Sequence, residues 1–146
     1  MITSTTIAEE LERHGSCAST TSGTSMRPLL KTGRDVVVIE VPKGELRRFD
    51  VALYRYPSGK YVLHRVIRVK ADEYLIRGDN TYVIEHIPKE WVLGVLVRFN
   101  RKGKSHSVTE RPYRVYVALW SFIYPVRHLL YAVRRLCGRL YHRMKR

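Results

Sequence analysis

The feature that most constrains this chain is a series of short apolar runs, rich in Val, Ile, Tyr and Phe, separated by turn residues. Runs of this length and composition predict β-strands joined by tight turns. We expect strands over residues 16–22, 35–41, 49–56, 60–70, 74–77 and 91–99, although the Ser- and Thr-rich 16–22 segment is also compatible with a loop. The continuous β-branched run 35–41 is typical of a strand buried on both faces, and Pro57-Ser58-Gly59 marks a hairpin. The pattern therefore predicts a mainly β fold.

The two ends of the chain have a different pattern, which predicts helices. Thr6 can cap a short helix that ends at His14, with Glu9 placed for a capping box and Gly15 for the stop. After Glu110 there are nine basic residues and no acidic one. Beyond Pro125, apolar residues recur at about the helical period between the basic ones, which predicts a basic amphipathic helix. We therefore divide the chain into a β domain, residues 1–110, and a basic aromatic tail, residues 111–146.

The charge of the chain limits its partners. The formal net charge is +14, which suggests an acidic partner, either nucleic acid or an anionic membrane surface. Much of that charge lies in the apolar, aromatic segment 111–146, which favours the membrane surface over a phosphate backbone. The start of the sequence lacks the pattern of a signal peptide, and no apolar run of spanning length is present. The two cysteines, Cys17 and Cys137, suggest neither a disulfide framework nor a metal site.

Three short motifs, in a fixed order, suggest catalysis. The first is Gly23-Thr24-Ser25-Met26-Arg27-Pro28, in which the Pro restricts the backbone around it and the turn can expose the Ser25 hydroxyl. The second is His64-Arg65-Val66, inside a β-branched run. The third is Gly78-Asp79-Asn80, and Glu85 follows Asp79 by six positions. A serine is a poor nucleophile until a base lies within hydrogen-bond reach, and His64 is the base that the sequence offers.

In this order the motifs resemble the boxes of the type I signal peptidase family and its relatives, the self-cleaving repressor proteases. The nucleophile box of that family reads Gly-x-Ser-Met-x-Pro, and residues 23–28 match it at every fixed position. Residues 64–66 match the branch whose base is a histidine rather than a lysine, and residues 78–80 match the Gly-Asp-Asn box. The resemblance spans about residues 15–99 and implies a signal-peptidase-type β domain without a metal or organic cofactor. Most members carry an N-terminal transmembrane helix, and the pattern of this sequence departs from that.

The resemblance implies a role for each matched residue. Ser25 attacks a peptide carbonyl after His64 accepts its proton. The Ser25 backbone N–H is the first oxyanion donor, and Thr24 or Ser22 is a candidate for the second. Glu85 stands at the offset where an acid completes the triad in the eukaryotic branch, and Asp79 is the other candidate for a supporting acid.

Each of these residues also has a purely structural interpretation, which the sequence leaves open. A strand histidine that bonds a neighbour is the alternative for His64, although the motif context favours catalysis, and a carboxylate that holds a Gly-Asp-Asn turn is the alternative for Asp79. Arg65 would then be a solvated charge on the strand face opposite His64. The helix of the tail could pack its apolar side on the β domain and leave only its charges in solvent.

We predict a serine endopeptidase that acts on a peptide or protein substrate through a Ser25–His64 dyad. The alternatives are an inactive adaptor of the same fold at a membrane surface and a basic nucleic-acid-binding protein. A repressor-type autoprotease is disfavoured, because only 24 residues precede Ser25. We expect a bacterial, membrane-associated protein whose residues 111–146 contact an anionic membrane surface. The side of the membrane, the cleavage site and the oligomeric state stay open.

Overall fold

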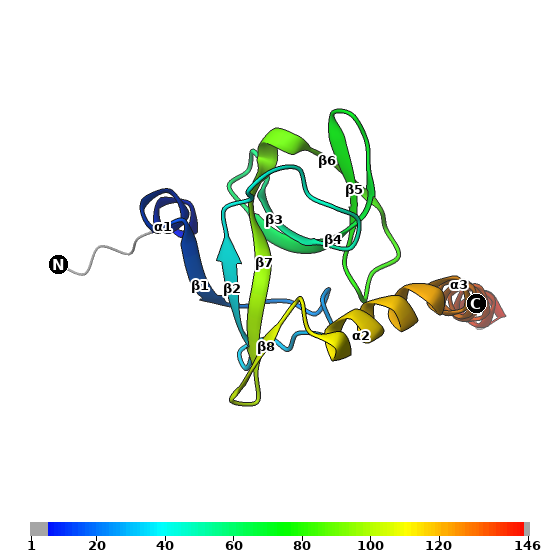
Figure 1. Ribbon diagram of the computed structural model, residues 1–146. Coiled ribbons are helices and arrows are strands. Elements are labelled where there is room, and N and C mark those ends of the chain that lie inside the picture. Colours follow the sequence, from blue (N-terminus) through cyan, green and yellow to red (C-terminus); the bar gives the residue numbers. More distant parts are fainter. Residues whose placement is uncertain (1–5, 145–146) are drawn as a thin grey trace.

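The centre of the molecule is one antiparallel sheet of eight strands (Figure 1). The computed structural model describes residues 6–144. The strands are β1 (Ser16–Thr20), β2 (Val36–Glu40), β3 (Val51–Arg55), β4 (Tyr61–Val69), β5 (Glu73–Arg77), β6 (Glu85–Pro88), β7 (Val92–Arg101) and β8 (Lys104–Ser107), and a 3-10 turn, η1 (Lys89–Trp91), precedes β7. Their order in the sheet is β1-β2-β7-β3-β4-β5-β6, with β8 paired to β7. The prediction of a mainly β fold is therefore confirmed.

Local signals place the first helix and the hairpin where the sequence predicts them. The helix α1 (Ile7–His14) begins at Thr6 with a capping box to Glu9, and Gly15 ends it in the left-handed region. Tyr56 and Lys60 pair across the Pro57–Gly59 turn, with the Tyr56 N–H 2.9 Å from the Lys60 carbonyl oxygen. The Ser- and Thr-rich segment forms a strand, β1. Strands β6 and β8 are not among the predicted ones, because both are short and largely polar.

The prediction that residues 35–41 are buried on both faces is wrong. In β2, Val37 and Ile39 are buried, while the alternate residues are only partly covered. The β-branched run therefore covers a core on one face only. Gly94 lies inside β7, and the strand continues through it. A side chain at Gly94 would collide with Ile39 on the neighbouring strand, which explains a glycine at this position.

Two helices follow the sheet. Helix α2 (Arg111–Phe122) lies beside the β domain, and α3 (Tyr124–Met144) continues away from it (Figure 1). The break at Ile123 comes just before Pro125, where a proline is tolerated in the first turn of a new helix. Val117 of α2 is buried against the domain. Within residues 6–144, neither of these helices nor α1 combines the length and the apolar character that a membrane span needs.

Candidate active site

The nucleophile motif forms a turn between β1 and β2, anchored from beneath by apolar side chains. Met26, Leu29 and Leu30 are buried in a core cluster that also holds residues of α1 and β2. The Leu30 N–H donates to the Met26 carbonyl at 3.0 Å, which closes the turn. Gly23 enters it with a φ of 83°, a conformation that favours glycine. Ser25 is therefore held on a fixed backbone while its side chain remains partly exposed.

The Gly-Asp-Asn segment clamps this turn from the other side. The Asn80 N–H donates to the Ser25 carbonyl oxygen at 2.7 Å. The Asn80 side-chain amide donates to the Thr24 carbonyl oxygen at 3.3 Å. Gly78 approaches closely: a Cβ built there would lie 3.0 Å from the Ser25 Cβ and 3.1 Å from His64 Nε2. Ser25 and the outer nitrogen of His64 therefore both border the space beside Gly78. They can approach it this closely only because Gly78 has no side chain.

His64 is buried in β4 and directs its other nitrogen toward an acid. Its Nδ1 lies 3.1 Å from Glu85 Oε1 and 3.2 Å from the Tyr54 hydroxyl. A carboxylate at Nδ1 favours the tautomer that carries a proton there and leaves Nε2 free to accept one. Burial lowers the pKa of His64 below its usual value, and the neighbouring Glu85 opposes this only in part. The imidazole is therefore neutral near pH 7, the form that a general base requires.

Glu85, at the start of β6, is held by Tyr54 of β3 and by Tyr56, which follows that strand. Tyr54 donates to Glu85 Oε2 at 2.6 Å, and Tyr56 donates to the same oxygen at 2.5 Å. Burial acts to raise the pKa of Glu85, but the two tyrosine hydroxyls and His64 outweigh it, so the net shift is downward. Glu85 is therefore ionised at neutral pH and turns its second oxygen toward His64.

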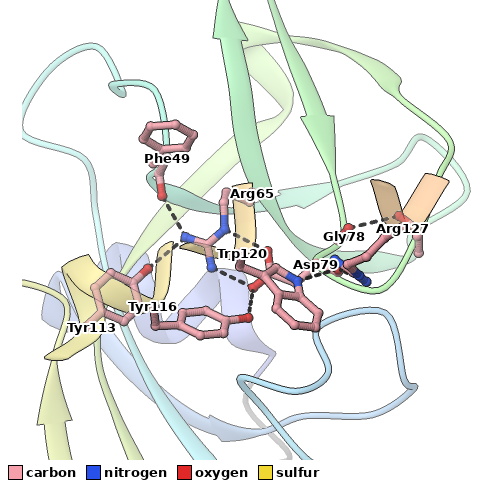
Figure 2. Close-up of polar contacts among 9 residues, drawn as sticks. Phe49, Arg65, Gly78, Asp79, Tyr113, Tyr116, Trp120 and Arg127 are labelled. Carbon is pink, nitrogen blue, oxygen red and sulfur yellow. Dashed lines mark hydrogen bonds and ion pairs between the residues drawn. The ribbon is translucent and has the colours of Figure 1, made fainter. Parts of the chain in front are cut away.

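Asp79, the other predicted acid, is instead paired with Arg65 (Figure 2). Two guanidinium nitrogens of Arg65 donate to the two carboxylate oxygens, each at 2.7 Å. The Tyr116 hydroxyl donates to Asp79 Oδ2 at 2.8 Å, and Trp120 Nε1 donates to the Asp79 carbonyl oxygen at 2.8 Å. Burial opposes the charge of Arg65, but Asp79 outweighs it and raises the pKa of Arg65 above its usual range.

The interpretation of Arg65 as a solvated charge is wrong, because the side chain is only 3% exposed. The face of β4 opposite His64 is covered by the start of α2, whose Tyr113 hydroxyl accepts from Arg65 Nη1 at 3.0 Å. Arg65 also donates to the Phe49 carbonyl oxygen at 3.0 Å. The basic residue of the second motif thus connects the β domain, the Gly-Asp-Asn segment and α2 (Figure 2).

A cleft of about 680 Å³ opens along these residues. Ser25, His64, Asn80 and Glu85 line it together with the edge strand β1 and the segment that follows it. Its deeper wall is apolar and includes Leu30, Val37, Ile39, Leu53 and Leu63.

No protein-family model and no curated protein sequence matches this chain.

Sequence reasoning missed the two tyrosines that hold Glu85. The pairing of β3 with β4 could have indicated them, because Ala52 pairs with His64 and Tyr54 with Val62. Side chains two apart on a strand share a face, so Tyr54 and Tyr56 lie on the face of His64. The residues of α2 that hold Asp79 carry no comparable signal, since Tyr116 and Trp120 are distant in sequence from the motif they contact.

Proposed function

We propose that this protein is a serine endopeptidase of the signal-peptidase type, with Ser25 as nucleophile, His64 as general base and Glu85 as the acid that orients His64. The observation that carries the proposal is the junction at Gly78, where Ser25 and His64 Nε2 approach the same point while Glu85 occupies Nδ1. Acyl transfer needs a nucleophile beside a base, and an acid that orients the base from its other side.

The proposed reaction follows from these positions. His64 Nε2 accepts the Ser25 proton as the hydroxyl oxygen attacks the peptide carbonyl, and the imidazolium then protonates the leaving amine. Between these two proton transfers His64 is an imidazolium, and the Glu85 carboxylate beside Nδ1 stabilises its positive charge. The Ser25 N–H, at the start of its turn, is suited to stabilise the oxyanion. Water then hydrolyses the acyl-enzyme with His64 again as base.

The cleft suits an extended peptide. Among residues 6–144, β1 pairs with β2 alone, so its outer edge is open to a further strand beside Ser25. An extended segment can add to such an edge as a further strand, with alternate side chains directed into the apolar part of the cleft. We propose a peptide or protein substrate bound in this way, with small residues before the cut as the resemblance implies.

The test is labelling by a serine-reactive phosphonate probe, read by mass spectrometry of the labelled peptide. We expect labelling at Ser25 in the wild type, none in Ser25→Ala, and labelling slowed by about 10²-fold or more in His64→Ala, the scale for losing a positioned general base. All three proteins should have the same circular dichroism spectrum. A folded wild type that is not labelled, or is labelled equally fast without His64, overturns the proposal.

A further inference from the structure

Helices α2 and α3 share a row of exposed apolar side chains that no part of the described chain covers. We call it the outer stripe, and its members recur every three or four residues apart from the adjacent pair Leu129 and Leu130: Val115, Leu119, Phe122, Val126, Leu129, Leu130, Val133 and Leu136. Each is at least 49% exposed, and Phe122 reaches 83%. An apolar row of this length is unusual on the surface of a soluble domain and marks an interaction surface.

The opposite side of α2 is occupied, so the stripe is the free side of the helix. Tyr113, Tyr116 and Trp120 contact the β domain through Arg65 and Asp79 (Figure 2). Tyr116 and Trp120 fall between members of the stripe along the sequence, as residues on two faces of one helix do. The break at Ile123 does not end the row, since it resumes at Val126.

The charge around the stripe has a single sign. Arg134 and Arg135 are exposed on α3, and the sequence from Arg111 to Arg146 has nine basic residues and no acidic one. A second copy of this chain on the stripe would bring these charges together, which opposes self-association. Nucleic acid would match the charge but would leave the apolar side chains in water. An anionic lipid surface matches both, because the headgroups attract the arginines and the acyl boundary takes the apolar row.

We propose that the outer stripe docks this protein on an anionic lipid bilayer, with α2 and α3 lying in the headgroup region. This goes beyond the proposed peptidase activity and does not depend on it. The stripe is firmly attached to the β domain: Arg127 of α3 donates to the Asp79 carbonyl oxygen at 3.2 Å, and the rings of Tyr82 and Tyr131 stack with centroids 4.4 Å apart.

The attachment has a consequence for the candidate active site. Asp79 lies between Gly78, which approaches Ser25, and Asn80, which bonds the Ser25 backbone. The same three residues thus meet both the helices and the nucleophile turn. Docking through the outer stripe therefore sets the orientation of the cleft relative to the lipid surface. A peptide anchored in that surface would be presented to Ser25 at a high local concentration.

The docking is tested by vesicle flotation with the full chain carrying Ser25→Ala, so that the result is independent of catalysis. The vesicles are phosphatidylcholine alone or phosphatidylcholine with phosphatidylglycerol. The stripe variants are Val133→Gln and the double change Leu129→Gln with Leu136→Gln. Val41→Gln is the matched control, because Val41 is a valine of similar exposure (43%, against 49% for Val133) that follows β2. Circular dichroism and sedimentation velocity without lipid check folding and self-association.

We expect flotation with the anionic vesicles, weak flotation with phosphatidylcholine alone, and partial release at high salt, because screening removes only the electrostatic share. Val133→Gln should weaken partitioning by roughly fivefold and the double variant by about 10²-fold, from the apolar area no longer buried, while Val41→Gln changes nothing. Equal flotation of stripe variants and control overturns the proposal, as does a wild type that does not float. A dimer that forms without lipid and is abolished by Val133→Gln assigns the stripe to a second copy instead. If the protein does not float but binds DNA in a salt-sensitive way, and the stripe variants leave that binding unchanged, the basic charge serves nucleic-acid binding and the proposal is overturned.

Discussion

Glu85 Oε1 lies 3.1 Å from His64 Nδ1, although the strands that carry the two residues are not neighbours in the sheet. Strand β5 separates β4 from β6, and Glu85 pairs with Ile76 of β5. The acid stands at the very start of β6, and the hydroxyls of Tyr54 and Tyr56 donate to its other oxygen, Oε2. The contact distinguishes Glu85 from Asp79, whose carboxylate is taken by Arg65.

Replacing Glu85 with Gln should slow the labelling of Ser25 by about 10²-fold or more, because the imidazolium loses its counter-charge and the tautomer of His64 is no longer fixed. The measurement is the second-order rate of labelling by the phosphonate probe. Thermal melts should show that the variant is folded. Gln retains the shape of the side chain, so a variant as fast as the wild type would mean that Glu85 has no part in orienting His64.

The pH dependence of labelling gives a second, independent test of the same contact. Burial lowers the pKa of His64, so the rate should be at its plateau at pH 7 and fall as the pH drops through a midpoint below about 6.5. Glu85 acts to raise the pKa of His64, and Glu85→Gln should therefore move that midpoint to still lower pH while the plateau falls. A midpoint above 6.5 in the wild type, or an upward shift in Glu85→Gln, would contradict the assignment.

The parts of the site that the sequence predicts are the local ones. Gly23 and Pro28 predict the turn around Ser25. Thr6 predicts the start of α1, and Gly15 predicts its end. These signals work because each concerns groups within a few residues of one another. The predicted strands also follow from local composition, although burial of β2 on one face only depends on what packs against the sheet.

The remaining parts depend on contacts that local patterns do not encode. Alternation along β4 places Arg65 opposite His64, and a solvated charge is the default for such a position. Arg65 is nevertheless buried, because α2, almost fifty residues later in the chain, covers that face of β4. The Tyr113 hydroxyl of α2 accepts a hydrogen bond from Arg65. Whether Asp79 or Glu85 supports His64 could not be decided from the sequence for the same reason, since the preference of Asp79 for Arg65 follows from the packing of α2.

Replacing Asp79 with Asn should lower stability rather than change the chemistry directly. The change leaves the buried Arg65 without its counter-charge, which costs about 3–5 kcal/mol in comparable buried pairs. The free energy of unfolding, from urea titration, measures the loss. Glu73→Gln is the control, because Glu73 forms its ion pairs with Lys70 and His86 at the surface, where solvent screens the charges and the loss should be much smaller. Similar losses in the two variants would show that the Arg65–Asp79 pair contributes no more than a surface pair.

The close approach at Gly78 gives the sharpest test of the whole site. A methyl group there would lie 2.7 Å from the Ser25 carbonyl oxygen and 3.1 Å from His64 Nε2, so Gly78→Ala has to displace the nucleophile turn, the base or both. Misplacement by about 1 Å is enough to cost on the order of 10²-fold in rate. Overpacking should also lower the free energy of unfolding by about 1–3 kcal/mol.

Gly44→Ala is the matched control, because a Cβ at Gly44 meets nothing within 4 Å and the backbone there is not in the left-handed region. It should label at the wild-type rate and be as stable or slightly more so, since alanine restricts the unfolded chain. The comparison is made by the labelling rate at saturating and at limiting probe, together with urea unfolding. A Gly78→Ala protein that remains as reactive as Gly44→Ala would mean that Ser25 and His64 do not need the proximity that Gly78 permits, and the dyad would have to be abandoned.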